Sequence, residues 1–428
     1  MAGRHRVVIV GGGFAGLSVA RSLRGAPVDI TLIDRDNFHS FQPLLYQVAT
    51  GSLSPANIAS PLRHILKNHK NTTVLLAEAT HIDVDNRRLI LSDGELPYDT
   101  LIVATGASHQ YFGHDDWEQH APGLKTIGDA IDMRRRIFMA FEAAERETDP
   151  QNLREWLTFV IVGGGPTGME LAGALGEIAN DTLRHDFRHI DPAASRIILV
   201  EGADRLLPSY PPRLSAAAKK MLEDLGVTVR TGAMVTDIQQ RAVTIRVGDH
   251  DEVISTRTIL WAAGVLASPL GRILRDEAGA KLDRAARVIV EPDLTIAGHP
   301  EIFVVGDLAH VATKNGDSLP GMAQPAIQGG AYVAKAIRQR LRGEGVKPFQ
   351  YFDRGTMATI GRHSAVADLN WLQISGIPAW LLWIFIHIVY IIQFQNRILI
   401  MMQWAWLYFT YDRSARLITG KSPLPLDL

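Results

Sequence analysis

The sequence contains no cysteine among its 428 residues. This absence excludes disulfide bridges, thiolate metal ligands and catalytic thiols. The chain also lacks a surplus of either charge, because 44 basic residues nearly balance 45 acidic ones and leave a net charge of −1. It has no long block of like charge. The composition therefore gives no electrostatic case for a nucleic-acid partner.

Two further absences concern targeting and metal binding. The first apolar stretch, residues 7–10, begins six residues after Met1 and leaves no room for a secretory or transit segment. We therefore expect this end of the chain on the cytoplasmic side. The 15 histidines form no ligand cluster, so no metal site is predicted. With 46% hydrophobic residues, the chain is long enough for two or three globular domains.

Two glycine-rich segments, residues 11–16 and 163–168, share the pattern G-x-G-x-x-G. Each follows an apolar stretch and precedes a helix-like one, and they lie 152 residues apart. In such a strand–turn–helix unit the glycines permit a tight turn, approach of backbone N–H groups to a pyrophosphate, and close helix packing. The pair predicts two dinucleotide sites in an α/β fold of two Rossmann-like domains. The defining glycines are Gly11, Gly13, Gly16, Gly163, Gly165 and Gly168.

An acidic residue follows each glycine turn at the end of the next predicted strand. Asp34 comes 23 residues after Gly11, where the pattern expects an acceptor for a ribose hydroxyl. The alternative is an ordinary turn aspartate. Glu201 comes 38 residues after Gly163, which exceeds the usual ~20. We attribute this excess to an extended helix and loop over residues 180–195.

Small residues follow three other apolar strands, as expected at the ligand-binding edge of an open α/β sheet. They are Ala104, Thr105 and Gly106 after residues 101–103, Ala263 and Gly264 after residues 258–260, and Gly306 and Asp307 after residues 302–305. Asp307 is also compatible with a helix N-cap. Further strands are expected at residues 89–91, 196–200, 227–231 and 242–247, and helices at residues 130–146 and 323–341.

The last 58 residues hold five of the eight tryptophans, and no charged side chain occurs between Asp368 and Arg397. The apolar stretch over residues 377–394 is long enough to suggest a spanning helix. His387 and Gln393 within the stretch, and Pro378 at its start, argue against it. We expect two amphipathic helices that lie in the membrane interface. A tryptophan-rich dimer interface is compatible with this interpretation.

These features together resemble the type II NADH:quinone oxidoreductases, also called alternative NADH dehydrogenases. The family consists of single-subunit flavoproteins with two dinucleotide-binding domains that do not pump protons. The resemblance covers essentially the whole chain and is most specific at residues 43–49, 163–172 and 323–328 and in the tryptophan-rich tail. It implies non-covalent FAD in the first site, exchangeable NADH/NAD+ in the second, and electron transfer to a membrane quinone.

The resemblance also implies roles for individual residues. Glu170 would help to couple hydride and proton transfer, and the quinone would pass Gln324 and Gln328. A first-turn carboxylate stabilised by the helix dipole is the alternative for Glu170. The implied cofactor-binding set is Gly11, Gly13, Phe14, Ala15, Gly16, Asp34, Arg35, Ala104, Thr105, Gly106, Gly163, Gly165, Pro166, Thr167, Gly168, Glu201, Ala263, Gly264, Gly306, Asp307, Ala323 and Gln324.

From the same resemblance we expect three regions and a location. The FAD-binding domain would comprise residues 1–125 and 290–345, the NADH-binding domain residues 126–289, and a membrane-anchoring and dimerisation region residues 346–428. The protein would be a homodimer attached peripherally, as a monotopic protein, to the cytoplasmic face of the inner (plasma) membrane.

The lack of cysteine separates this family from two relatives. Sulfide:quinone oxidoreductases and disulfide reductases share the fold but need cysteine chemistry, so both are excluded. A flavin-dependent NADH:ferredoxin-type reductase remains an alternative, although it would have no use for the tryptophan-rich tail. A nucleotide-sensing membrane protein without turnover is the alternative from another class.

Overall fold

The computed structural model describes residues 4–313 and 316–419. The chain divides into two compact units, each built from three separate segments. Unit 1 comprises residues 1–40, 59–108 and 265–353, and unit 2 comprises residues 41–58, 109–264 and 354–428. The chain thus changes unit after residues 108 and 264, whereas the sequence suggested functional boundaries after residues 125 and 289. Those functional boundaries stay a prediction, and the end of the expected C-terminal region, residues 420–428, lies outside the described residues.

Unit 1 is organised around a six-stranded sheet in the order β20-β21-β9-β1-β2-β5. All neighbouring strands run parallel except the edge pair β20 and β21. Buried β-branched and leucine side chains fill the central strands, as in a sheet covered on both faces. The strands are β20 (Thr295–Ile296), β21 (His299–Val304), β9 (Thr100–Val103), β1 (His5–Val10), β2 (Val28–Asp34) and β5 (Thr72–Leu76).

Two helices pack together in unit 1, α1 (Phe14–Ser22) and α10 (Ala323–Leu341). Their contact needs small residues, because a Cβ atom on Gly330 would lie 2.4 Å from the carbonyl oxygen of Ala15. The Ser18 hydroxyl also donates a hydrogen bond to the Ile327 carbonyl across 2.8 Å. The bounds of α10 are those predicted from the sequence.

Smaller elements complete unit 1. An antiparallel sheet, β6-β7-β8, packs against α9 and shares one hydrophobic core with the large sheet. The short strands β3 and β4 pair at the point where the chain leaves the unit and returns. The elements are β6 (Ala79–Asp83), β7 (Arg88–Leu91), β8 (Gly94–Pro97), α9 (Leu270–Ala278), β3 (Phe38–Ser40), β4 (Ala59–Pro61), α4 (Leu62–Ile65), β19 (Val288–Ile289) and β22 (Ala309–His310).

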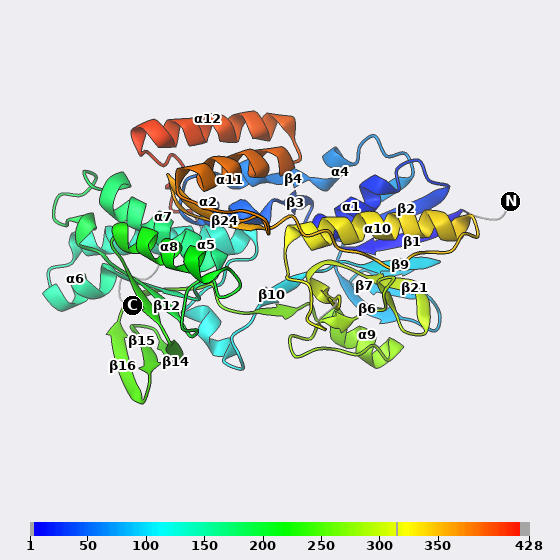
Figure 1. The fold of residues 1–428 in the computed structure, drawn as a ribbon, viewed down its shortest axis with the longest axis horizontal. Coiled ribbons are helices and arrows are strands. Elements are labelled where there is room, and N and C mark those ends of the chain that lie inside the picture. Colours follow the sequence, from blue (N-terminus) through cyan, green and yellow to red (C-terminus); the bar gives the residue numbers. More distant parts are fainter. Residues whose placement is uncertain (1–3, 314–315, 420–428) are drawn as a thin grey trace. The chain divides into compact units, whose positions relative to one another are not determined.

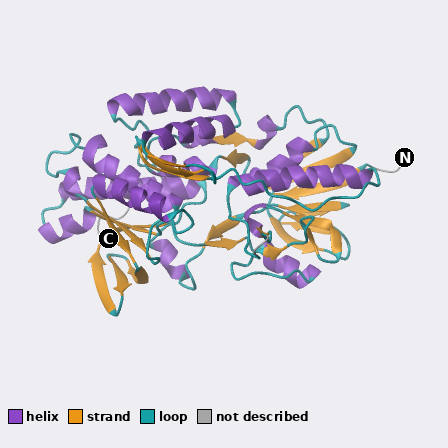
Figure 2. Ribbon diagram, viewed as in Figure 1, coloured by secondary structure: helices purple, strands orange, loops and turns teal. Residues whose placement is uncertain are grey.

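Unit 2 repeats the central arrangement of unit 1. Its four parallel strands follow the order β13-β12-β11-β17, so the strand before the glycine turn again lies between the next strand and a later one. Helices lie beside this sheet (Figure 2). The elements are β13 (Val227–Thr231), β12 (Arg196–Glu201), β11 (Thr158–Val162), β17 (Thr258–Trp261), α5 (Ile127–Arg146), α6 (Pro150–Trp156), α7 (Pro166–Glu177) and α8 (Pro212–Asp224).

Two antiparallel sheets of unit 2 were not expected from the sequence beyond the strand at residues 242–247. The sheet β14-β15-β16 forms part of a core with β11 and β12, and the sheet β23-β24-β25 packs against α7. A Cβ atom on Gly173 of α7 would lie only 1.8 Å from the Ile360 carbonyl oxygen. The strands are β14 (Ala233–Gln239), β15 (Ala242–Val247), β16 (His250–Ser255), β23 (Thr356–Gly361), β24 (Ser364–Asp368) and β25 (Gln373–Ser375).

The tryptophan-rich segment forms two helices, α11 (Ile377–Tyr390) and α12 (Phe394–Thr410), which lie side by side (Figure 1). The apolar stretch at residues 377–394 is therefore not one continuous helix, because α11 ends at Tyr390 and α12 begins at Phe394. Arg397 stabilises this break, because its guanidinium donates to the carbonyl groups of Val389 and Ile391 at 2.8 and 2.7 Å. Within residues 4–313 and 316–419, neither of these helices nor any other has the length and apolar character needed to cross a bilayer.

Candidate functional sites in the two units

The first glycine turn, in unit 1, connects β1 to α1. Gly11 has a φ of +105°, and a Cβ atom there would lie 2.4 Å from the carbonyl oxygen of Ala104. A Cβ atom on Gly16 would lie 1.9 Å from the carbonyl oxygen of Gly11. By contrast, a Cβ atom on Gly13 would meet nothing within 4 Å. Two glycines are therefore required by backbone packing, and the third faces open space at the N-terminus of α1.

The second turn, in unit 2, follows the same steric pattern between β11 and α7. Gly163 has a φ of +110°, and a Cβ atom there would lie 2.9 Å from the carbonyl oxygen of Ala262. A Cβ atom on Gly168 would lie 1.8 Å from the Gly163 carbonyl oxygen, whereas one on Gly165 would again meet nothing within 4 Å. Each unit thus presents a sterically open glycine at a helix N-terminus, the arrangement that binds a pyrophosphate.

Each turn is joined to the acidic residue at the end of the next strand. Asp34 accepts hydrogen bonds from the N–H groups of Gly12 and Asp36 at 2.5 and 2.8 Å. Glu201 accepts them from Gly164 and Ala203 at the same two distances. These bonds fix both carboxylates, whose remaining lone pairs can accept ribose hydroxyls.

The long spacing before Glu201 has a local structural cause. After α7 the chain continues as a short π-helix, η3 (Ile178–Thr182), and then as a mostly irregular segment before β12. This insertion lengthens the connection without moving Glu201 from the end of the second strand.

The other predicted residues of unit 1 gather at the same carboxyl edge of its sheet. Thr105 follows β9, which lies beside β1, and Asp307 follows β21, which lies on the other side of β9. The Thr105 hydroxyl oxygen is buried and has no hydrogen-bond partner among the described residues. Asp307 and Gly306 line a small cavity with Met322. These polar atoms around an open glycine turn fit the demands of FAD.

His39 also lies at this edge of unit 1. Its Nδ1 lies 2.9 Å from the carbonyl oxygen of Gly12, and its ring meets Phe14 edge-on at 5.0 Å. Burial lowers the pKa of His39, so the ring is neutral at pH 7. Because a carbonyl only accepts, Nδ1 carries the proton and Nε2 is left as an acceptor with no partner among the described residues.

Glu170 is the fifth residue of α7 in unit 2, and the first turn of this helix contains no acidic residue, so the alternative of a first-turn carboxylate is wrong. Burial raises the pKa of its carboxyl well above the usual value, and a hydrogen bond from the backbone N–H of Thr359 opposes this shift. Burial, followed by the Glu170 charge, also raises the pKa of Tyr46, while burial is the main cause that raises the pKa of Tyr210 to about 12. Glu170 therefore sits in an apolar setting close to two buried phenols.

The two glutamines predicted to meet the quinone both lie on α10 in unit 1, and Glu170 lies in unit 2. Gln324 is in the first turn of the helix. One turn later, Gln328 donates to the carbonyl oxygen of Phe352 at 2.9 Å and accepts from its N–H group at 3.0 Å. Gln328 thus holds the backbone of the segment after α10, and the quinone role of both residues stays a prediction.

The remaining residues predicted to bind a cofactor lie after strands or at the starts of helices. Gly106 follows β9 in unit 1 and Gly264 follows β17 in unit 2, while Arg35 is exposed after β2. Ala263 also follows β17, and the others lie at helix starts: Ala15 in α1, Pro166 and Thr167 in α7, and Ala323 in α10. Their contacts with cofactors stay predictions.

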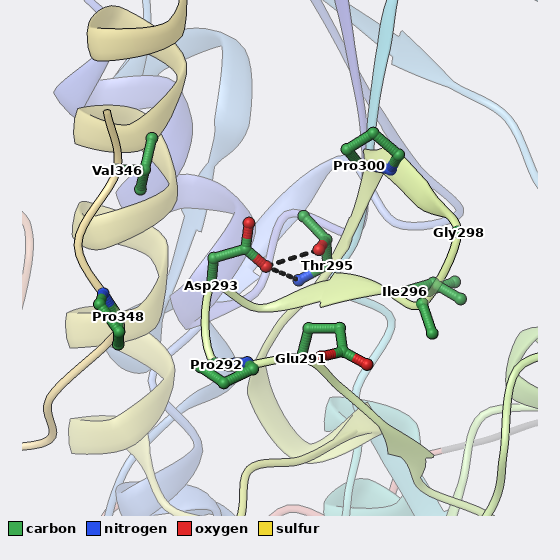
Figure 3. A pocket seen from close by; sticks show the side chains of 10 residues that line it. Glu291, Pro292, Asp293, Thr295, Ile296, Gly298, Pro300, Val346 and Pro348 are labelled. Atoms are coloured by element: carbon green, nitrogen blue, oxygen red, sulfur yellow. Dashed lines mark hydrogen bonds between the residues drawn. The ribbon is translucent and has the colours of Figure 1, made fainter. Parts of the chain in front are cut away.

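A surface pocket of unit 1 lies at the edge strand β20, away from all of these residues. Glu291, Asp293 and Thr295 line it, and both the N–H and the hydroxyl of Thr295 donate to the Asp293 carboxylate (Figure 3). No predicted cofactor residue contributes to its wall. We assign it no part in the chemistry. Across the described chain, no group of three or more acidic or histidine side chains could hold a metal ion.

Unit 2 contains a buried ion pair that could not be predicted from the sequence. Arg413, which follows α12, is only 3% exposed and donates to Glu177 at the end of α7 across 2.8 Å. The guanidinium also binds the hydroxyl groups of Thr50 and Ser52. The other Glu177 oxygen accepts from the N–H of Arg362. Partners separated by more than 200 positions leave no local sequence signal.

Two Rossmann-type turns, each paired with an acidic residue, define a pyridine-nucleotide oxidoreductase with two dinucleotide sites. Residues 5–330 match the family model of the pyridine nucleotide-disulphide oxidoreductases, and residues 354–410 match that of the NDH2 C-terminal domain. The chain belongs to the type II NADH:quinone oxidoreductases within this family.

Curated relatives and solved structures agree with this placement. The chain is 46% identical to the type II NADH:quinone oxidoreductase Ndh of Mycobacterium tuberculosis over 98% of its own length and 91% of that protein. It is 47% identical to NdhA of the same organism over 98% and 90%. The fold resembles NDH2 of Plasmodium falciparum, solved with NADH, with a TM-score of 0.88, 20% identity, and coverage of 97% and 100%.

Proposed function

We propose that the chain oxidises NADH bound in unit 2 and passes the electrons through FAD bound in unit 1 to a membrane quinone, without pumping protons. The observation that carries this proposal is the repeated turn: Gly13 with Asp34 and Gly165 with Glu201. The family membership supplies the reaction class. The lack of cysteine agrees with it, because this reaction needs no thiol.

The side chains and backbone of each unit bind and orient one dinucleotide. The N-terminus of α1 and the open face of Gly13 would hold the FAD pyrophosphate, with Asp34 on the adenosine ribose and Asp307 near the ribityl hydroxyls. The N-terminus of α7 and Gly165 would hold NADH, with Glu201 on its ribose. When bound, the flavin accepts a hydride and later releases two electrons.

Glu170 supplies a group that can exchange a proton. Its raised pKa means that the carboxyl keeps its proton to higher pH than an exposed glutamate, as a general acid requires. Quinone reduction consumes two protons along with two electrons, so a buried exchangeable proton is useful there. Gln324 and Gln328 remain candidates for contact with the quinone.

We also propose that the protein attaches peripherally to the cytoplasmic face of the inner (plasma) membrane through α11 and α12. Large apolar side chains on these helices face solvent, including Phe385 at 67%, Met402 at 65% and Phe409 at 78% exposure. Such a surface supports docking onto lipid. The homodimer implied by the resemblance is a separate proposal, which sedimentation of the detergent-solubilised protein tests.

A spectroscopic experiment on the flavin tests the function. The purified protein should show a flavin absorption band that NADH bleaches under anaerobic conditions and that a soluble quinone restores. Asp34→Asn serves as a control that should lose flavin. An absence of bleaching in flavin-loaded protein would favour the nucleotide-sensing alternative, and reoxidation by a ferredoxin but not by a quinone would favour the ferredoxin-type reductase.

A further inference from the structure

A tight turn in unit 2 directs an aromatic side chain into the solvent. The N–H of His114 donates to the carbonyl oxygen of Tyr111 across 3.0 Å. Between them, Phe112 and Gly113 have φ values of +54° and +97°. Positive φ at both central positions is typical of a type I′ turn, where glycine, asparagine and aspartate are preferred. A phenylalanine there is strained, and its ring is 60% exposed, so burial does little to offset the strain.

The protein core holds this turn in place. The Tyr111 ring is 4% exposed, and its hydroxyl donates to the carbonyl oxygen of Ala121 across 2.8 Å. The indole N–H of Trp261, the last residue of β17, donates to the carbonyl oxygen of Gln110 across 3.1 Å. The ring of Phe112 lies near Trp261, with centroids 6.4 Å apart. The outward direction of Phe112 is therefore fixed by buried neighbours on both sides of the turn.

Phe112 lies against the small-residue turn that follows β17. A Cβ atom on Gly264 would lie 2.6 Å from the Cζ atom of Phe112, and Gly264 has a φ of +69°. Two residues earlier, Ala262 packs against the second glycine turn, because a Cβ atom on Gly163 would lie 2.9 Å from the Ala262 carbonyl oxygen. The exposed ring thus stands at the same edge of the sheet as the proposed nucleotide site.

The strand order of unit 2 indicates which end of a dinucleotide reaches this ring. The chain proceeds from β11 through β12 to β13 and later adds β17 on the other side of β11, so the order reverses between β11 and β17. Ligands of open α/β sheets bind in the crevice at such a point. Glu201 at the end of β12 is expected to bind the adenosine ribose, and the turn after β11 the pyrophosphate. The nicotinamide end would then extend toward β17 and Phe112.

We propose that Phe112 binds the nicotinamide end of the nucleotide in unit 2, with its ring as an apolar wall beside the backbone of Gly264. An aromatic ring offers a rigid contact surface, and offset or edge-to-face contacts between planar rings are favourable. Glycine at position 264 lets the ligand approach the main chain. The inference rests on the proposed function, because it assigns a residue to the nucleotide site of that reaction. It also accounts for the strained turn, which directs the ring toward the ligand and away from the core.

Calorimetric titration of the oxidised, flavin-loaded protein tests the inference without any reaction. NAD+ and ADP-ribose are the two probes, because ADP-ribose lacks the nicotinamide ring and neither compound can reduce the flavin. Phe112→Gly should weaken the binding of NAD+ by about tenfold and that of ADP-ribose by less than about twofold. Phe112→Tyr keeps the ring and should bind both probes as the parent does.

Controls separate a binding role from a structural one. Glycine adopts the positive φ of position 112 without steric cost, so Phe112→Gly should not lower the unfolding temperature. Arg87→Gly is the matched control, since Arg87 is exposed in unit 1 with the same φ of +54°, and it should leave both affinities unchanged. If Phe112→Gly does not fold, Phe112→Leu takes its place and should weaken NAD+ binding by about threefold.

The ratio of the two affinities decides the outcome. Equal weakening of NAD+ and ADP-ribose binding by the position 112 variant would overturn the inference. An unchanged ratio with a lower unfolding temperature would also overturn it, because the ring would then serve stability alone.

Turnover gives the second readout and distinguishes the two proposals. If both hold, Phe112→Gly should lower kcat/KM for NADH by about tenfold and leave kcat/KM for the quinone within about twofold of the parent. If NADH fails to bleach the flavin of a parent protein that binds NAD+, the proposed function is wrong, yet the titrations still decide the role of Phe112. If the parent turns over but the variant keeps the parent's affinity ratio, only the inference is wrong.

Discussion

The carboxylate of Glu201 accepts a hydrogen bond across 2.5 Å from the N–H of Gly164, the residue in the middle of the second glycine turn. The bond holds a negative charge at the end of β12, where the sugar of a bound nucleotide is expected. Asp34 and Gly12 form the same bond in unit 1. Two units of one chain thus use a single local design.

The position of Glu201 predicts a preference for NADH over NADPH, because a fixed carboxylate repels a 2′-phosphate. Glu201→Gln should lower the ratio of kcat/KM for NADH to kcat/KM for NADPH by about tenfold, equivalent to about 1.4 kcal/mol. Steady-state kinetics with a soluble quinone measure this ratio. Comparable kcat/KM values for both nucleotides in the parent protein would contradict the assignment.

Asp34→Asn should affect the proposed FAD site at the first glycine turn, and not the NADH site. Loss of the charge at the first turn should weaken FAD binding and lower the flavin-to-protein absorbance ratio, while the nucleotide preference of the remaining holoenzyme stays unchanged. If Asp34→Asn instead altered the NADPH ratio, the two turns would have been assigned in the wrong order.

The sequence predicted those parts of the molecule whose signals are local. The two glycine turns, the helix at residues 323–341 and the strands at residues 227–231 and 242–247 all have the expected bounds. Each depends on a short pattern of apolar spacing or on a steric need for glycine. The helix expected at residues 130–146 begins three residues earlier, at Ile127, because Thr126 and Asp129 form a capping box.

The parts that could not be predicted depend on partners distant in the sequence. Gln47 and Trp404 are 357 positions apart, and Arg413 and Glu177 are 236 apart. The sequence around each of these residues contains no pattern that identifies its partner, because only the fold brings the two together. The β23-β24-β25 sheet was also unpredictable from the sequence. Its packing on α7 requires glycine at position 173, and no local sequence pattern indicates this requirement.

The pKa of Glu170 predicts how its replacement changes stability with pH. Because the folded-state pKa lies well above the unfolded value of about 4.3, the native protein holds a proton that the unfolded chain releases. Stability from this group is complete below pH ~4.3 and falls as the pH rises toward the folded-state pKa. Glu170→Gln should therefore gain stability relative to the parent as the pH rises from about 4.3 toward the folded-state pKa of Glu170. Urea titrations across this range measure the difference, and a constant difference would contradict it.

Arg413→Met should be strongly destabilising. The change leaves the buried Glu177 carboxylate without its cation, a defect that costs about 3–5 kcal/mol. The double variant Glu177→Met with Arg413→Met should lose less than the sum of the two single changes. Arg246→Ala, which breaks an exposed pair with Asp251, is the control and should leave the free energy of unfolding unchanged.

Membrane attachment can be tested without removing any segment. Changing Phe385, Met402 and Phe409 to serine should weaken binding to phospholipid vesicles by more than about 100-fold, because each change removes a large apolar group from the proposed lipid contact. Flavin content should stay the same. Val253→Ser is the control, since Val253 is 64% exposed on β16. Equal vesicle binding by the triple variant and the parent would show that this face does not dock on lipid.

The three-segment construction of unit 2 has a consequence for its synthesis on the ribosome. Ser52 leaves the exit tunnel early, but its partner Arg413 lies 361 positions later. The hydroxyl of Ser52, just after the short helix α2 (Leu45–Ala49), therefore has to wait for this guanidinium until almost the whole chain has been translated. A ribosome stalled at any point before residue 413 would carry a nascent unit 2 that lacks the buried Arg413–Glu177 ion pair. For this protein, chaperone protection of the nascent chain should last until the final stage of translation.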